Sequence, residues 1–421
     1  MSEKILQILP ADRIPYTRNR TLDEETLAQA SEIIDGIKKG GEEALEEYSK
    51  RLGDIETKKE IRVSQEELLS ALSSLLPEER SVLERTADRI QSFARAQLSS
   101  IAEISVPIPG GRAGHKILPI ERAGCYAPGG RYPLPSTVLM TAITARVAGV
   151  KSICLACPKP SRIMLAAAAV AGVDELLAVG GAQAIAALAY GVGISAPCDI
   201  VVGPGNRYVT AAKAILSGQV KIDMLAGPSE LVVFADKSTN PSLVAADLLA
   251  QAEHDTDALP ALISTSEKLI KSVELELESQ LETLTSADIA REALRNGFAV
   301  LARSIEEGID ICNQLAPEHL QLMCESAQEL ANKFTNYGSL FIGENSAEVF
   351  GDYGAGPNHV LPTAGSARTT SGLSVFTFLR FPTWMQIDDL YSEKDLIEDT
   401  AALARLEELE GHARAAETRS K

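Results

Sequence analysis

Four residues of this 421-residue chain have types and spacings that suit metal binding or proton transfer. Gln251 and His254 are three residues apart on a predicted helix and therefore share one face. This spacing can present two ligands to one metal ion, although a polar helix end explains it equally well. Glu318 and His319 are adjacent at the start of a predicted strand. A carboxylate and an imidazole in one cleft can divide water activation and proton transfer, whereas a surface loop pair is the simpler interpretation.

A loop near the carboxyl end is rich in chemically useful side chains. The segment GDYGAGPNHVLPT (351–363) includes Asp352 and His359 among three glycines and two prolines. It has no helix or strand pattern, and loops of this composition are more often functional than average. Glu407 and His412 are five residues apart, about 140° around an ideal helix, so one helix face would not present both. Their types alone therefore predict no function.

Three glycine-rich turns follow predicted strands: YAPGG (126–130), VGGAQ (179–183) and VGPGN (202–206). Glycines at such turns allow the backbone to approach a phosphate or ribose beside a helix amino terminus. None of the turns matches the GxGxxG dinucleotide pattern. Strand-to-helix turns need glycine in any case, so a nucleotide site and an ordinary turn both remain open.

The elements that must position these residues belong to the α/β class. Between about residues 118 and 345, short apolar runs alternate with helical patterns, which predicts parallel sheets flanked by helices. About eight strands are many for one sheet, so we expect two Rossmann-like modules, with a switch near LAGPSE (225–230). Residues 1–110 and 373–421 have the pattern of charged helices and predict helical N-terminal and C-terminal segments.

Composition and charge exclude several classes of protein. Apolar residues make up 45% and charged residues 23%, as in globular proteins, and the formal net charge is −18. This acidity argues against nucleic acid or an anionic membrane as the main partner. The uncharged stretch 176–198 could span a bilayer by length, but Gly180, Gly181 and Gln183 favour a buried strand, turn and helix.

The cysteines predict a reducing compartment. The chain has six cysteines without the spacing of a disulfide framework, and its amino terminus lacks the apolar run of a signal peptide. Cys154 and Cys157 form a CxxC inside an apolar strand run, which favours a buried structural pair over zinc or redox chemistry. We therefore expect a cytoplasmic protein.

Taken together, several long blocks resemble the histidinol dehydrogenase family, in consistent order from about residue 20 to residue 415. The blocks are YAPGG, YPLPSTVLM, VGGAQAIAALAYG, VGPGNRYVTAAK, DMLAGPSE, LLAQAEHD, APEHL and GDYGAGPNHVLPT. The resemblance implies a homodimer that uses one Zn²⁺ per subunit and two NAD to oxidise L-histidinol, through the aldehyde, to L-histidine. The expected division is an N-terminal extension (1–22), a discontinuous first module (23–125 and 231–372), a second module (126–230) and a C-terminal helical dimerisation tail (373–421).

The resemblance also implies roles for individual residues. The implied zinc ligands are Gln251, His254, Asp352 and His412. The implied catalytic pair is Glu318 and His319. The implied NAD contacts are Tyr126, Gln183 and Asn206. The implied substrate contacts are Ser229, Gln251, His254, His319, Asp352, His359, Glu407 and His412. In this family the tail carries its His and Glu into the partner subunit's site, so we expect a domain-swapped dimer.

Some positions depart from the commonest family pattern. Thr144 stands where proline is usual, and the segments 191–199 and 378–387 are divergent. These departures leave open a sulfopropanediol-type alcohol dehydrogenase of the same superfamily. Glu407 suits a cationic substrate better than a sulfonate, which favours histidinol. A non-catalytic nucleotide-binding protein would not need Glu318 and His319 beside metal-type ligands.

Overall fold

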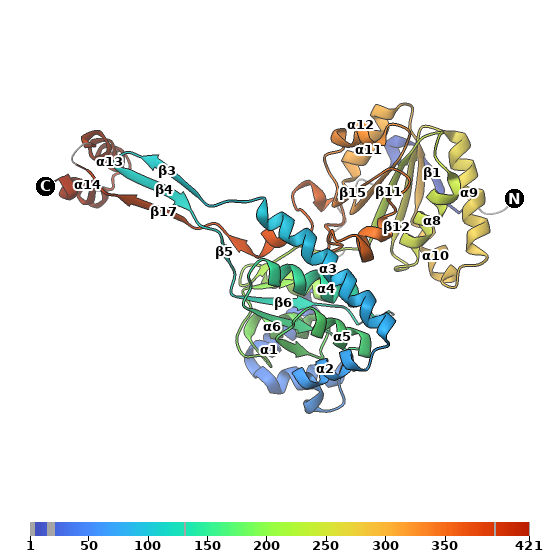
Figure 1. The fold of residues 1–421 in the computed structure, drawn as a ribbon, viewed down its shortest axis with the longest axis horizontal. Coiled ribbons are helices and arrows are strands. Elements are labelled where there is room, and N and C mark those ends of the chain that lie inside the picture. The colour runs from blue at the N-terminus through green and yellow to red at the C-terminus, as the bar shows by residue number, and fades with distance from the viewer. Residues whose placement is uncertain (1–4, 15–21, 130–131, 391–392, 421) are drawn as a thin grey trace.

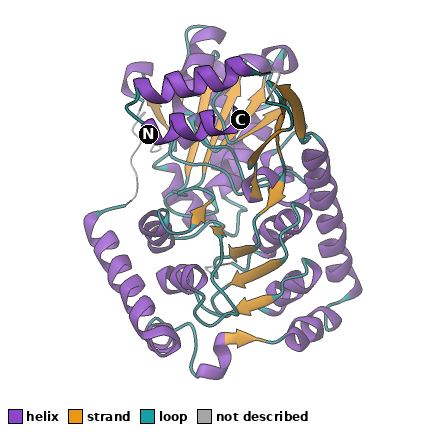
Figure 2. Cartoon of the chain, turned by 90° about the vertical axis from the view of Figure 1, so that its left-hand side faces the viewer, coloured by secondary structure: helices purple, strands orange, loops and turns teal. Residues whose placement is uncertain are grey.

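Two six-stranded sheets flanked by helices form the body of the computed structural model, which describes residues 5–14, 22–129, 132–390 and 393–420 (Figures 1 and 2). The first sheet has the order β1 (Gln7–Leu9), β13 (Phe298–Leu301), β12 (Leu259–Ser264), β11 (Glu230–Ala235), β14 (His319–Met323) and β15 (Ser339–Ile342). The second has the order β10 (Lys221–Ile222), β9 (Ile200–Val202), β6 (Arg122–Tyr126), β7 (Ser152–Ala156), β8 (Glu175–Leu177) and β2 (Arg62–Val63). All pairings are parallel except that of β2 with β8, which confirms the predicted α/β class with two parallel-sheet modules.

Helices that begin at recognisable caps cover the first sheet. They are α8 (Pro241–Ala252), α9 (Glu267–Leu281), α10 (Ala287–Leu294), α11 (Ile305–Leu315) and α12 (Ala327–Leu330). The Asn240 side chain accepts a hydrogen bond from the Ser242 N–H, and Pro241 occupies the first helical position. Apolar residues on both faces of the strands are buried, as expected for a parallel sheet covered on both sides.

The helices before residue 100 pack on the second sheet, so the expected grouping of residues 23–125 with 231–372 is wrong. These helices are α1 (Glu24–Arg51), α2 (Gln65–Ser73) and α3 (Pro77–Ser99). They pack against α4 (Pro135–Val147), α5 (Arg162–Val170), α6 (Gly181–Tyr190) and α7 (Arg207–Leu216). Ile34 and Ile37 of α1, for example, join Leu188 of α6 and Val209 of α7 in one core. Burial of this apolar face decides which module the helices belong to.

The first module instead begins with β1, which pairs with β13. This strand lies within the expected N-terminal extension (1–22), whose residues 1–4 and 15–21 are outside the described residues. Leu6, next to the strand, is buried with the helices of the first module. A strand this short has no clear sequence pattern, and its pairing with a buried neighbour stabilises it.

An arm projects from the body and carries the C-terminal helices (Figure 1). It consists of a three-stranded antiparallel sheet with the order β17 (Thr383–Ile387), β4 (Gly111–His115) and β3 (Ile104–Ile108), together with α13 (Lys394–Leu406) and α14 (Glu410–Glu417). At its base, β5 (Leu118–Pro119) pairs with β16 (Leu379–Arg380). The tail is therefore not entirely helical as expected, because residues 379–387 extend the chain as strands.

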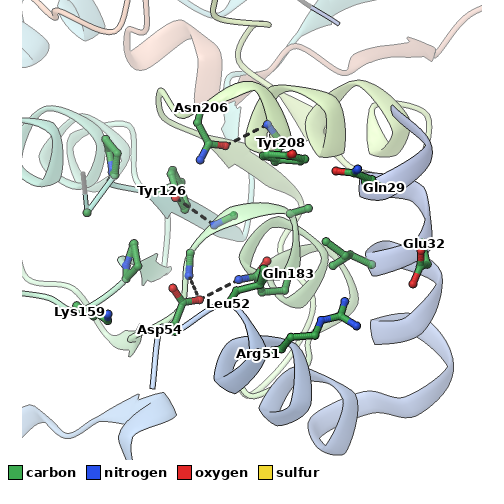
Figure 3. A pocket seen from close by; sticks show the side chains of 18 residues that line it. Gln29, Glu32, Arg51, Leu52, Asp54, Tyr126, Lys159, Gln183, Asn206 and Tyr208 are labelled. Atoms are coloured by element: carbon green, nitrogen blue, oxygen red, sulfur yellow. Dashed lines mark hydrogen bonds between the residues drawn. The ribbon is translucent and has the colours of Figure 1, made fainter. Parts of the chain in front are cut away.

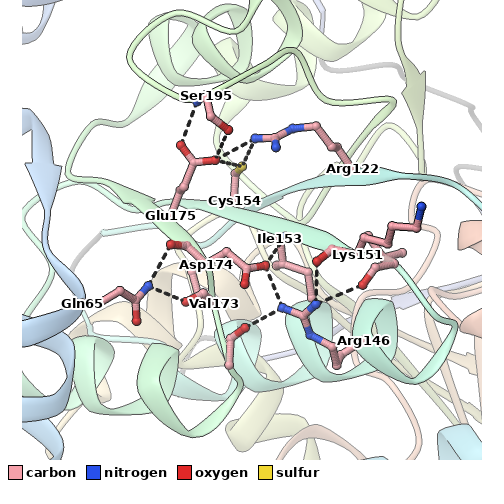
Figure 4. A network of polar contacts seen from close by, with 12 residues as sticks. Gln65, Arg122, Arg146, Lys151, Ile153, Cys154, Val173, Asp174, Glu175 and Ser195 are labelled. Carbon is pink, nitrogen blue, oxygen red and sulfur yellow. Dashed lines mark hydrogen bonds and ion pairs between the residues drawn. The ribbon is translucent and has the colours of Figure 1, made fainter.

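Polar contacts tie the loops at one end of the second sheet together (Figure 4). The Arg146 guanidinium donates to three backbone carbonyls and forms an ion pair with Asp174 at 2.7 Å. Arg122 likewise donates to Glu175 and to the Cys154 sulfur at 3.1 Å. Cys154 of β7 and Cys157 just after the strand are both buried, in different apolar cores, which confirms the burial predicted for this CxxC.

No helix among the described residues is long and apolar enough to cross a membrane. The uncharged stretch 176–198 forms the end of β8, a glycine turn and the buried helix α6, as predicted.

Candidate active site

The predicted catalytic pair lies at the amino end of β14, beside the start of β11. Ala316 ends α11 in the left-handed conformation (φ 49°), and Pro317 then directs the chain into the strand. The His319 Nδ1–H donates to the Glu230 carbonyl oxygen at 3.0 Å, and Glu318 accepts from the Glu230 N–H at 2.9 Å. With Nδ1 protonated, Nε2 of a neutral His319 has a free lone pair and can accept a proton.

Metal-type side chains surround the free nitrogen of His319. Asp352 Oδ1 lies 3.4 Å from His319 Nε2, and Asp352 Oδ2 lies 3.8 Å from His254 Nε2. Asp352 occupies a π-helical turn (Phe350–Gly354), a conformation frequent at functional sites. Glu348 precedes it by four residues, and ligand atoms of His254, Glu348 and Asp352 all lie within 4.8 Å of one another.

These residues fit a divalent metal such as zinc. Gln251, one helical turn before His254, is buried, and neither its oxygen nor its nitrogen has a hydrogen-bond partner. The oxygens of Glu348 are also without partners. Buried polar atoms normally find partners, so this group of atoms indicates a ligand. Imidazole, carboxylate and amide ligands together suit zinc and several neighbouring transition metals.

Burial and mutual charge shift the pKa values of the pair. Burial raises the pKa of Glu318 to about 7, although the positive charge of His319 acts to lower it. Burial alone would lower the pKa of His319, but the carboxylates of Glu318, Asp352 and Glu348 outweigh it and raise the pKa to about 10. A divalent cation among these carboxylates would counter their charge and favour the neutral imidazole.

His359 attaches the loop 351–363 to α4 of the other module. Its Nδ1–H donates to the Asp352 carbonyl oxygen at 3.0 Å, and its Nε2 lies 3.2 Å from Thr137 Oγ1. Next to it, the Asn358 amide donates to Thr144 Oγ1 at 3.2 Å. Thr144 therefore contributes an acceptor that holds this loop.

The three residues expected to contact NAD line one pocket of about 610 Å³ (Figure 3). Tyr126, Gln183 and Asn206 follow β6, β8 and β9, so they meet at the carboxyl edge of the second sheet. The Gly181 N–H donates to the Tyr126 hydroxyl at 3.2 Å. The Asn206 side chain caps α7 by accepting from the N–H groups of its first turn. The structure thus brings the three glycine-rich turns, with the residues that the family resemblance assigned to NAD, around one pocket.

Asp54 fixes the geometry of this pocket and was missed in the sequence. It accepts hydrogen bonds from the Gly180 N–H at 2.9 Å and from Gln183 Nε2 at 2.8 Å. The lining also includes two basic side chains, Arg51 and Lys159. Two carboxylates, Glu32 and Asp54, line the same pocket, so the basic side chains could contact a phosphate individually but do not make the lining positive as a whole. Asp54 lies in a short turn after α1 and belongs to no motif, so no sequence signal marked it.

Glu348 and Glu230 were also missed. Glu348 is four residues before Asp352, and this spacing on a helical turn is the signal that could have identified it. Glu230 follows Ser229, an expected substrate contact, and its carboxylate accepts from the Ala364 N–H at 2.8 Å. Burial raises the pKa of Glu230 to about 7.

The chain does not bring Glu407 and His412 to this cluster. Glu407 caps the end of α13 and His412 lies on α14, both exposed at the end of the arm. Figure 1 shows these helices on the far side of the molecule from β11. Their expected roles in metal and substrate binding therefore require a second chain.

Comparisons with known proteins agree with this geometry. A family model described as histidinol dehydrogenase matches residues 16–420. The histidinol dehydrogenase of Thermus thermophilus is 44% identical over 391 residues, which cover 92% of this chain and 93% of that protein. That of Methanothermobacter thermautotrophicus is 42% identical over 397 residues, covering 93% of this chain and 92% of that protein.

A solved structure is similar over the same length. The crystal structure of histidinol dehydrogenase from Elizabethkingia anophelis matches with a TM-score of 0.93 and 34% identity, covering 100% of this chain and 99% of that chain. Histidinol dehydrogenases are oxidoreductases that catalyse the last two steps of histidine biosynthesis. Because the family model and the relatives cover nearly the whole sequence, the chain belongs to the histidinol dehydrogenase family.

Proposed function

We propose that this protein oxidises L-histidinol through L-histidinal to L-histidine, using zinc and two molecules of NAD. The observation that carries the proposal is the position of Glu318 and His319 against the cluster of His254, Glu348 and Asp352, in a chain of this family. A base, a second acid–base group and metal ligands meet there, with 3.6 Å between His319 Nδ1 and Glu318 Oε2 and 3.4 Å between His319 Nε2 and Asp352 Oδ1.

The two residues of the pair divide the proton transfers. His319 takes the hydroxyl proton of the alcohol at Nε2, the nitrogen that has no hydrogen-bond partner. NAD, when bound, accepts the hydride in each oxidation. At the aldehyde stage Glu318 removes a proton from the attacking water. Its pKa is raised to about 7, which lies close to neutral pH and suits a general base. His319 returns its first proton to the aldehyde oxygen as water adds, which frees Nε2 to accept the proton of the hydrate hydroxyl in the second oxidation.

Gln251, His254 and Asp352 would hold zinc within one subunit. When bound, the metal would position the imidazole and amine nitrogens of the substrate, since transition metals of this type favour nitrogen ligands. His359 donates a hydrogen bond to the backbone carbonyl of Asp352 and so helps to hold the turn that carries this ligand.

A second copy of the chain would complete the site with Glu407 and His412 from its arm. The arm exposes apolar side chains, including Leu406 at 82% and Met385 at 67% exposure. Exposed apolar surface of this kind is typical of a contact with another chain, and exchange of such an element gives a symmetric dimer. Glu407 would then face the cationic substrate. All six cysteines are free thiols, which is compatible with the proposed cytoplasmic location.

The test is NADH formation with L-histidinol and, separately, with 2,3-dihydroxypropane-1-sulfonate. We expect two NADH and one L-histidine for each L-histidinol consumed, and no turnover of the sulfonate. Turnover of the sulfonate alone would contradict the proposal and favour a sulfopropanediol-type enzyme.

A further inference from the structure

Glu348 is a completely buried carboxylate that has no conventional partner. Its exposed fraction is 0%, and neither oxygen makes a hydrogen bond among the described residues. Its nearest basic atom is His319 Nδ1, 3.9 Å away. That nitrogen already donates to the Glu230 carbonyl oxygen at 3.0 Å. No ion pair with a lysine or arginine is formed by Glu348 in the part of the chain that the structure describes.

A buried carboxylate in this state needs a cation. Removing an ionised carboxylate from water costs several kcal/mol unless an opposite charge or hydrogen bonds replace the solvent. Among the described groups that act on Glu348, His319 is the one potential cation, and it also faces the carboxylates of Glu318 and Asp352, so three carboxylates share one imidazole. The unsatisfied oxygens therefore face a place where a positive ligand belongs.

The geometry locates that ligand at the His254–Asp352 pair. Two ligand atoms on one metal, each at about 2.1 Å, lie at most about 4.2 Å apart. The ligand atoms of His254, Glu348 and Asp352 lie within 4.8 Å of one another, so small side-chain movements would close the group. A primary ammonium group held beside the metal would occupy almost the same position.

We propose that Glu348 is a cation-binding residue of the active site, whose carboxylate contacts either the bound metal directly or the amine of the substrate beside it. The inference rests on the proposed function and adds a fourth group from within the chain to Gln251, His254 and Asp352. These four groups assemble without the arm of another chain, so one subunit would bind the metal before His412 arrives.

The first experiment measures metal binding by the full-length variant Glu348→Gln. The amide keeps the shape of the side chain and removes an uncompensated buried charge, so the apoprotein should unfold at the same temperature as the wild type or higher. If the metal is the contact, zinc affinity measured against a chromophoric chelator should fall at least about tenfold. The visible absorption bands of the cobalt(II)-substituted protein should also change. Glu329→Gln, an exposed residue of α12, is the matched control and should change neither.

The second experiment measures substrate binding by calorimetry, with the zinc-loaded proteins and without NAD. L-Histidinol is compared with 3-(imidazol-4-yl)propan-1-ol, which lacks only the amine. If the amine is the contact, Glu348→Gln should weaken L-histidinol at least about tenfold and leave the analogue unchanged, because only the ammonium group loses a charged partner.

The predicted change in either experiment supports the proposal and identifies the cation that Glu348 contacts. The proposal is overturned if zinc affinity, cobalt spectrum and the preference for L-histidinol over the analogue all remain as in the wild type. A loss of turnover without these changes also overturns it and indicates a role through His319. If the wild type itself fails to bind zinc or L-histidinol, the proposed function is contradicted instead, so the two failures are distinguishable.

Discussion

Replacing Asp54 by alanine should weaken NAD binding without changing the chemical steps. In the structure one carboxylate oxygen, Asp54 Oδ2, accepts both from the Gly180 N–H at 2.9 Å and from Gln183 Nε2 at 2.8 Å. These contacts hold the turn before α6 and the Gln183 side chain in place at the wall of the pocket. Without these hydrogen bonds, the turn and the Gln183 side chain would become ordered only when NAD binds.

The magnitude follows from the cost of that ordering. Immobilising a side chain such as that of Gln183 costs about 0.5–1.5 kcal/mol. Fixing the backbone of one turn residue costs roughly 1–2 kcal/mol. The sum is about 1.5–3.5 kcal/mol, and since 1.4 kcal/mol is tenfold, the Kd for NAD should rise roughly 10- to 300-fold.

The assay combines calorimetric titration of NAD with initial rates at saturating L-histidinol. We expect Asp54→Ala to raise the Kd and the KM for NAD while kcat changes little. Asp54→Asn keeps an acceptor oxygen at the same place and should lose less. Asp35→Ala, on the exposed face of α1, the helix that precedes the Asp54 turn, is the control and should have no effect. A Kd for NAD within threefold of the wild type in Asp54→Ala, at unchanged thermal stability, would refute this reasoning.

Four further predictions concern the catalytic cluster. Glu318→Gln should slow aldehyde oxidation by roughly 100- to 10,000-fold and alcohol oxidation far less, as measured by supplying each substrate separately; equal losses would argue against water activation by Glu318. Because Glu318 must be deprotonated to act as a base and burial raises its pKa to about 7, the wild-type aldehyde step should accelerate as pH rises through about 7, and Glu318→Gln should abolish that rise. Chelation should abolish turnover but leave the far-ultraviolet circular dichroism largely intact, because the two modules have large apolar cores of their own; global unfolding would contradict this. Asp352→Ala should lower the zinc content of the purified protein, and a full metal load would exclude Asp352 as a ligand.

The sequence predicted the parallel sheets and the glycine-rich turns after their strands because both depend on local patterns, although the turns alone left a nucleotide site open. Apolar runs and glycines marked the strands and the turns that follow them, and the structure confirms Tyr126, Gln183 and Asn206 around one pocket. The same rule places ligands at carboxyl ends of strands, yet Glu318 and His319 lie at the amino end of β14. Only the family resemblance brought this pair together with Asp352.

Features that depend on long-range packing could not be predicted. The helices of residues 24–99 have clear apolar faces, but periodicity does not tell which sheet covers them. The strands of the arm are short, contain glycine and proline, and are largely exposed, so no alternating burial pattern marks them. Asp54 belongs to no motif, and only its hydrogen bonds to residues distant in the sequence show its role.

The most direct test of the central claim, that two chains build each active site, is complementation between two inactive variants. Glu318→Ala damages the cluster at β14, and His412→Asn damages the end of the arm. Unfolded and refolded together in equal amounts, they should form about half mixed dimers, each with one doubly damaged site and one intact site. Activity should then recover to roughly a quarter of the wild-type value, while each variant refolded alone stays inactive. If mixed dimers are confirmed by mass spectrometry and no activity returns, the arm serves its own chain and the account of a shared site is contradicted.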